Sequence, residues 1–170
     1  MLAATGARFS QLARMRVADV QVDQARLMIP PSSKGKGKAK SYIRMQVGQD
    51  VMTVLKQVCE GRRNDAVLLE RWHHRQTGPV AWERTGRQSW KTPSEMRRPW
   101  IDLMKKLNLD GVIPYALRHS SIVRGLRVGL PIRLVAANHD TSVAMIERHY
   151  ARWISDSLDD LSARAIVNLV

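Results

Sequence analysis

YALRHSSIVRGLRVGLPIRLVAANHDTSVAMIERHY, residues 115–150, is the most informative segment of the chain. Its apolar residues recur at helical spacing, and Gly-Leu-Pro and then Asp-Thr-Ser interrupt the pattern. Arg118 and Tyr150 lie 32 positions apart, near the two ends of the segment. We expect three helices: from Pro114 to about Arg127, from Pro131 to Ala137, and from a cap at Thr141 or Ser142 to about Tyr150.

A second informative motif, Thr5-Gly6-Ala7-Arg8, lies near the beginning of the chain. Glycine lets a backbone turn and approach a neighbour closely. The planar guanidinium of Arg8 can donate two parallel hydrogen bonds to phosphate oxygens. Residues 2–15 around this motif carry apolar side chains at spacings compatible with helical segments.

Between residues 19 and 47 the pattern changes to that of β-strands. Arg26–Ile29 predicts a strand that Pro30-Pro31 ends, and residues 42–47 predict its antiparallel partner. The connector, SSKGKGKAK at residues 32–40, is a basic, glycine-containing hairpin tip.

The middle of the chain is less informative. A helix is expected from Gly48 to about Glu60, and residues 61–90 resemble a long variable loop. Thr92-Pro93-Ser94-Glu95 is a helix start with a capping box. Residues 155–170 suggest a final amphipathic helix with more acidic than basic side chains. On the helix after Gly48, the face expected to be buried consists of Val51, Val54, Leu55 and Val58.

Charge is the strongest compositional signal. Twenty-eight Lys and Arg against 15 Asp and Glu give a net charge of +13 and a pI near 10.9, which favours a polyanion such as nucleic acid as partner. The lone Cys59 excludes an internal disulfide and suits a reducing cytoplasm. Cys59, His73 and His74 lack a second ligand pair at metal-site spacing, so neither metal nor cofactor is expected. No apolar run is long enough for a membrane span.

These motifs together resemble the catalytic domain of the tyrosine recombinases, the phage-integrase family. Its members carry T-G-x-R-x-x-E-L, a lysine in a β-hairpin, H-x-L-R-H, L-G-H and a tyrosine. The resemblance implies an α+β fold, mostly α-helical, with a small antiparallel β-sheet or hairpin near the N-terminus. Residues 1–170 would form one catalytic domain with an incomplete N-terminus, because family members carry further helices and a DNA-clamping domain ahead of this point. The final helix, about 155–170, would dock on a partner protomer.

The resemblance also implies a chemistry. Tyr150 would attack the scissile phosphate and form a 3′-phosphotyrosyl link, and Arg8 and Arg118 would grip that phosphate. A hairpin lysine would protonate the leaving 5′ oxygen; Lys34 is favoured, with Lys36 and Lys38 as rivals. The residues expected to contact DNA are Lys34, Lys36, Lys38, Lys40 and Arg44.

The sequence departs from the family motifs at several positions. Tyr115 replaces the first histidine of H-x-L-R-H, and Gln11 stands where the family usually has an acid. The histidine of L-G-H normally lies nine residues before the nucleophile, which is Thr141, whereas His139 lies eleven residues before it. Either Thr141 donates a hydrogen bond to phosphate, or a local shift brings in His139. His119 is interpreted as making a structural hydrogen bond.

The implied function is site-specific DNA recombination or integration for a phage or mobile element. Double-stranded DNA would be the substrate, and a homo-oligomer, as in the family's tetrameric synapse, would act on it in the bacterial nucleoid within the cytoplasm. Two alternatives are an inactive DNA-binding remnant and a nicking-closing enzyme like the type IB topoisomerases.

Overall fold

The computed structural model describes residues 1–32, 41–155, 162–163 and 166–167. It has the expected mixed architecture, mostly helical with small antiparallel sheets. The strands are β1 (Val20–Gln21), β2 (Arg26–Ile29), β3 (Ile43–Gln46), β4 (Glu70–Gln76) and β5 (Trp82–Ser89). The α-helices are α1 (Leu2–Thr5), α2 (Phe9–Leu12), α3 (Gln49–Cys59), α4 (Arg97–Lys106), α5 (Ala116–Arg127), α6 (Ile132–Asn138) and α7 (Val143–Ser155).

The first half of the chain packs around a three-stranded antiparallel sheet of order β1-β2-β3. In β2, Leu27 and Ile29 are fully buried while Arg26 and Met28 are partly exposed, as an alternating strand requires. These side chains share one apolar core with α3 and the N-terminal helices. The predicted strand Arg26–Ile29 and its partner are therefore confirmed.

Helix α3 has the predicted position but a different buried face. Met52 and Leu55 are buried, whereas Val54 and Val58 are exposed, so the predicted face was wrong for these two valines. Met52 lies three residues before Leu55, on the same side of the helix, and both side chains belong to the apolar core.

The second half packs α5, α6 and α7 around a separate apolar cluster that includes Ile122, Leu126 and Ile146. The three predicted helices of the 115–150 segment are present. Ser142 Oγ accepts a hydrogen bond from Met145 N at 3.2 Å, which confirms the predicted cap. However, α7 continues to Ser155 instead of ending near Tyr150, so Tyr150 lies inside a helix.

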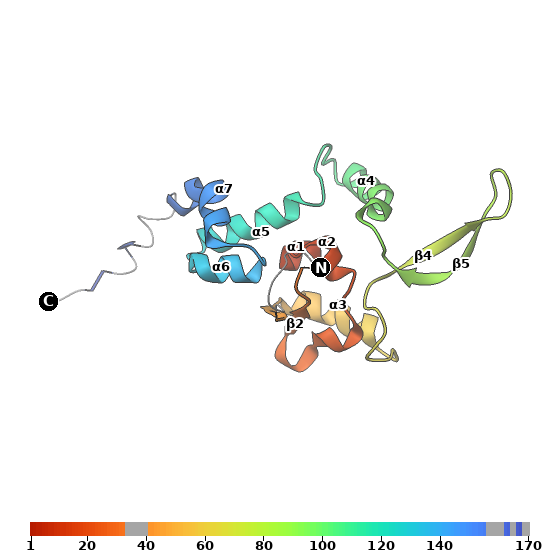
Figure 1. Ribbon diagram of the computed structural model, residues 1–170, viewed down its shortest axis with the longest axis horizontal. Helices are drawn as coiled ribbons and strands as arrows, with labels where there is room; N and C mark the ends of the chain where they lie inside the picture. Colours follow the sequence, from red (N-terminus) through yellow and green to blue (C-terminus); the bar gives the residue numbers. More distant parts are fainter. Residues whose placement is uncertain (33–40, 156–161, 164–165, 168–170) are drawn as a thin grey trace.

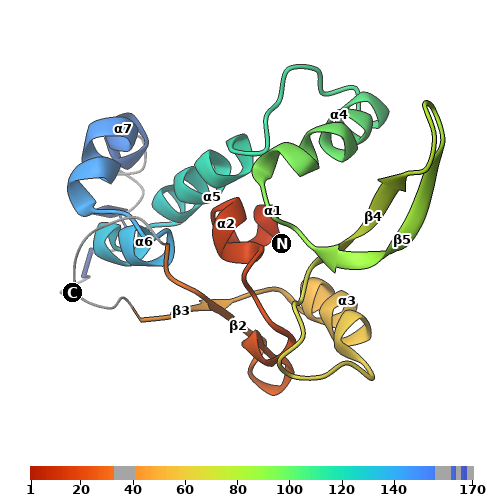
Figure 2. The same cartoon turned by 45° about the vertical axis from the view of Figure 1, so that its right-hand side comes forward.

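Residues 61–90 are not simply a loop, and that prediction was wrong. Strands β4 and β5 pair as a two-stranded antiparallel ribbon, with Trp72 opposite Arg87. The Arg84 and Arg87 guanidiniums lie 5.4 and 5.9 Å from the Trp72 ring centroid. In Figures 1 and 2 this ribbon projects from the body on the side away from α6 and α7. Its strands are mostly polar, so the apolar alternation that marks a strand in a sequence is absent.

The two halves meet where α1 packs against α5 (Figure 2). Gly6 ends α1 in the left-handed conformation, with φ of 60°. A Cβ atom on this residue would lie 2.7 Å from Ser121 Cβ and 2.8 Å from His139 Nε2. The close approach of the two halves therefore requires glycine at this position.

Gly6→Ala is expected to destabilise the protein more than Gly61→Ala. Both glycines are left-handed, which costs an alanine about 1–2 kcal/mol, but a Cβ on Gly61 meets no atom within 4 Å. The contacts at Gly6 should add about 1–3 kcal/mol, as overpacking does. Denaturant unfolding of both variants measures the difference, and equal losses would show that the approach at Gly6 is not tight.

Candidate active site

A pocket of about 630 Å³ lies between α5, α7 and the segment that joins α1 to α2. It brings together five of the seven residues predicted to be catalytic, although they lie up to 142 positions apart in the sequence. These five are Arg8, Tyr115, Arg118, Thr141 and Tyr150. Lys34 falls outside the described residues, and His139 does not line this pocket.

Arg118 is buried, with 4% of its surface exposed. Its Nη1 donates to the carbonyl of Gly6 at 2.9 Å, and its Nη2 donates to the carbonyl of His139. Among the described residues, no carboxylate forms an ion pair with it. Burial lowers the pKa of Arg118, and the nearby charge of Arg8 lowers it further, yet a guanidinium stays protonated at neutral pH. Within the part of the chain that the structure describes, the Arg118 guanidinium is therefore a fixed positive charge in this pocket without a carboxylate partner.

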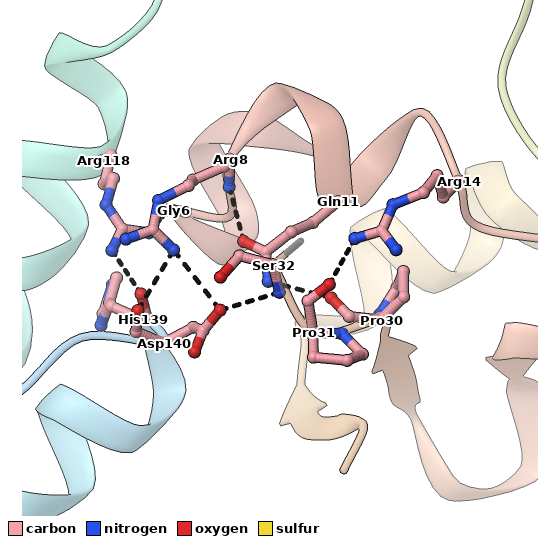
Figure 3. Close-up of polar contacts among 10 residues, drawn as sticks. All are labelled: Gly6, Arg8, Gln11, Arg14, Pro30, Pro31, Ser32, Arg118, His139 and Asp140. Carbon is pink, nitrogen blue, oxygen red and sulfur yellow. Dashed lines mark hydrogen bonds and ion pairs between the residues drawn. The ribbon is translucent and has the colours of Figure 1, made fainter. Parts of the chain in front are cut away.

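Arg8 lies at the start of α2 and reaches the turn between α6 and α7. Its Nη1 donates to the Asp140 carbonyl at 3.1 Å and lies 3.5 Å from the carboxylate oxygen Oδ2 of the same residue. Figure 3 shows the guanidinium groups of Arg8 and Arg118 side by side, both directed at His139 and Asp140. Two arginines from distant segments are thus held by one turn.

Gln11 fixes the backbone that carries Arg8. Its Oε1 accepts a hydrogen bond from Arg8 N at 3.0 Å, and its Nε2 donates to the Pro30 carbonyl at 2.9 Å (Figure 3). Gln11 is 1% exposed. An ionised acid could accept the first bond but could not donate the second. The amide therefore connects Arg8 to the end of β2.

Tyr150 is 7% exposed, and its hydroxyl is hydrogen-bonded to His119 Nδ1. Burial raises the pKa of Tyr150, Tyr115 raises it further, and Arg118 opposes both. The sequence interpretation gave His119 a structural hydrogen bond, whereas the structure places it against the hydroxyl of the predicted nucleophile. His119 is the last residue of the H-x-L-R-H motif, but the motif alone did not indicate that it contacts Tyr150, 31 positions later in the sequence.

The two positions where histidines were expected have different surroundings. Tyr115 is half exposed at the mouth of the pocket, with its ring centroid 5.0 Å from that of His119. Thr141 lines the pocket. His139 is buried, and burial lowers its pKa, which favours the neutral ring; Nδ1 then donates to the Val135 carbonyl at 2.8 Å, and Nε2 accepts from Ser121 Oγ at 3.0 Å. Of the two alternatives, the geometry favours Thr141 as a group that faces the pocket.

Only one of the predicted DNA contacts can be located. Arg44 is exposed on β3, where it pairs with Met28 of β2. Lys34, Lys36, Lys38 and Lys40 lie outside the described residues. Most of the helix expected at about 155–170 lies outside them as well.

A second pocket, of about 660 Å³, shares Arg8, Tyr115 and Arg118 with the first. It runs between the N-terminal helices and α4, and its walls are mainly apolar. Within the described part of the chain, no group of three or more His, Cys, Asp or Glu side chains could hold a metal ion. None of the helices described is both long enough and apolar enough to span a bilayer.

Comparison with known proteins shows where this fold occurs elsewhere. The fold is similar to that of XerA recombinase, with a TM-score of 0.66 and 20% identity over 98% of this chain and 55% of that one. It is also similar to the Tn1549 transposon integrase in complex with circular intermediate DNA, with a TM-score of 0.67 and 16% identity over 97% of this chain and 57% of that one. This chain thus spans just over half the length of these solved chains. Among curated proteins, no sequence matches. Residues 1–154 match the model of the phage integrase family, and the chain belongs to this family of tyrosine recombinases.

Proposed function

We propose that this protein cleaves and rejoins double-stranded DNA through a covalent link to Tyr150, as a site-specific recombinase. The observation that carries the proposal is the contact between the Tyr150 hydroxyl and His119 in a pocket that also contains Arg8 and Arg118. A phenol, a proton acceptor and two anion-binding groups are what transfer of a phosphodiester to tyrosine requires.

In the cleavage step, the Tyr150 oxygen attacks the scissile phosphorus and its proton passes to His119. A bond forms between phosphorus and the tyrosine oxygen, and the bond from phosphorus to the 5′ oxygen breaks. Lys34 supplies the proton that the leaving 5′ oxygen needs. Attack by a 5′ hydroxyl of another strand reverses the step, so the link conserves the phosphodiester energy and no cofactor is consumed.

Arg8 and Arg118 stabilise the negative charge of the pentacoordinate transition state. Because backbone carbonyls already hold Arg118 in a buried site, little reorganisation is needed when charge develops. Each such donor contributes about 3 kcal/mol, or on the order of 10² in rate. Tyr115 and Thr141 occupy the histidine positions of the family motifs and add neutral hydrogen-bond donors to the phosphate.

The proposed partner is double-stranded DNA, bound by more than one protomer. The net charge of +13 favours a polyanion, and a related fold has been solved with DNA. On this proposal the acidic C-terminal segment docks on a neighbouring protomer. The exposed Arg44 and the lysines of residues 34–40 contact the phosphate backbone.

Tyr150→Phe is expected to abolish covalent attachment to DNA and to leave folding and DNA binding intact, because it removes only a hydroxyl. Nicked duplexes with a randomised central segment would be incubated with the protein, and protease-sensitive adducts isolated on denaturing gels and sequenced. Tyr115→Phe removes a hydroxyl at the mouth of the same pocket and serves as the control, which should still form some adduct.

The outcomes of this experiment separate the alternatives. An adduct with Tyr150→Phe would refute the assignment of the nucleophile. No adduct with the unmodified protein would favour a DNA-binding remnant. Relaxation of supercoils without strand exchange would favour a nicking-closing enzyme.

His119→Ala is expected to slow adduct formation by about 10²- to 10⁴-fold, because it removes the group that accepts the Tyr150 proton. Added imidazole should restore part of the rate under single-turnover conditions on the duplex recovered above. His149→Ala, which changes another histidine of the pocket, is the control and should have a smaller effect without rescue. Equal behaviour of the two variants would exclude His119 as the proton acceptor.

Lys34→Ala is expected to lose cleavage of ordinary DNA but to regain it when sulfur replaces the leaving 5′ oxygen. A thiolate leaves without a proton, so this substrate makes the general acid unnecessary. If the sulfur substrate rescues Lys36→Ala or Lys38→Ala instead, one of those lysines is the donor.

A further inference from the structure

In the turn between α6 and α7, Asp140 has a backbone conformation that is energetically unfavourable for a residue with a side chain. Asp140 is left-handed, with φ of 47°, a region that glycine occupies freely and other residues rarely. In the L-G-H motif the glycine lies ten residues before the nucleophile, which is the position of Asp140. Aspartate tolerates this region better than most residues, but glycine would cost less. We therefore expect contacts of the Asp140 side chain to offset this conformational cost.

The Asp140 carboxylate lies between two segments of the site. Its Oδ2 accepts a hydrogen bond from Ser32 N at 2.8 Å and lies 3.5 Å from Arg8 Nη1. The Asp140 side chain is 11% exposed and that of Arg8 25%, so solvent screens this pair only in part. Ser32 is the last described residue before the basic segment that begins at residue 33. Figure 3 shows the carboxylate between the Arg8 guanidinium and Ser32.

We propose that Asp140 is a positioning residue, which orients the Arg8 guanidinium for phosphate binding and ties the start of the lysine-bearing segment to the same point. This inference rests on the proposed DNA cleavage function. Among the described residues, the contacts of the Arg8 side chain use only Nη1, which leaves Nε and Nη2 for a phosphate. The same turn then positions both arginines, because the carbonyl of His139, the residue before Asp140, accepts a hydrogen bond from Arg118.

Two variants of Asp140 separate its side chain from its backbone. Asp140→Gly removes the carboxylate and suits the left-handed backbone, so unfolding should show a stability equal to or above that of the unmodified protein. Asp140→Asn keeps an oxygen that can accept from Ser32 N but loses the charge opposite Arg8. Asn108→Gly relaxes another left-handed residue, at the end of α4, and Asp23→Asn removes an exposed acidic charge; both serve as controls.

The expected effect is on the rate of cleavage. At saturating duplex, Asp140→Gly should form adduct about 10- to 100-fold more slowly, as misplacement of a transition-state group by about 1 Å does. The rate of adduct formation by Asp140→Asn should lie between the rates of Asp140→Gly and the unmodified protein. DNA affinity should change no more than in Asp23→Asn, and Asn108→Gly should cleave at the normal rate. Normal or faster cleavage by Asp140→Gly would overturn the proposal; a faster rate would mean that the carboxylate competes with phosphate for Arg8.

A double-mutant cycle with Arg8→Lys distinguishes positioning from a general structural role. If Asp140 acts through Arg8, Asp140→Gly should slow the Arg8→Lys protein by much less than it slows the unmodified one. Multiplicative losses would contradict the proposal.

A measurement without catalysis keeps this inference separate from the proposed function. In ¹⁵N-labelled protein without DNA, the guanidinium resonances of Arg8, assigned with Arg8→Lys, should show restricted rotation that Asp140→Gly removes. If the unmodified protein forms no adduct but Arg8 loses its restriction in this variant, the cleavage function fails and the positioning stands. Equal mobility of Arg8 in both proteins would overturn the positioning role whatever the cleavage result.

Discussion

The two hydrogen bonds of the buried Arg118 guanidinium are the interaction on which the contact between the two halves of the protein depends. It joins the carbonyl of Gly6, from the first half of the chain, to the carbonyl of His139, from the second. Each half has its own apolar core, so the halves are joined by this bridge, the tight contact at Gly6 and the contacts of Asp140 with Arg8 and Ser32. Carbonyls are neutral, and a buried charge without a counter-ion is costly. The same bond that aligns the halves therefore leaves a positive site that an anion would stabilise.

Two departures from the family motifs, Gln11 and Asp140, both contact Arg8 and change the charge next to it. Gln11 gives up the negative charge of the usual acid and gains a donor that reaches Pro30. Asp140 adds a carboxylate at a glycine position and pairs with Arg8. The acidic side chain near Arg8 is thus at position 140, whereas the family motif has it at position 11. On the proposed function, two arginines would still bind the phosphate, and His119, the group that contacts Tyr150, would accept the proton of the nucleophile.

The sequence predicted the elements with strong local signals and missed those that depend on tertiary contacts. The helices of residues 115–150 have clear periodicity and breaks at Gly129-Leu130-Pro131 and Asp140-Thr141-Ser142, so their order was predictable. The β4–β5 ribbon was not, because its strands are mostly polar and exposed and lack the apolar alternation that marks a strand in a sequence. For the site, motif spacing predicted Arg8, Arg118 and Tyr150, which the structure brings together in one pocket. No local signal revealed that His119 meets Tyr150, since that contact requires α5 to pack on α7.

Exposed and buried arginines of this protein are expected to act on a bound anion over different distances. On the proposed function, exposed groups such as Arg44 would contribute to the long-range attraction of DNA, which salt screens and which carries no information about the scissile bond. Arg118, with 4% of its surface exposed, can do little for that encounter and interacts strongly only with a phosphate already in the pocket. The salt dependence of binding and the rate of cleavage at saturating DNA should therefore report on separate sets of arginines. A change in one without the other identifies which set a substitution has altered.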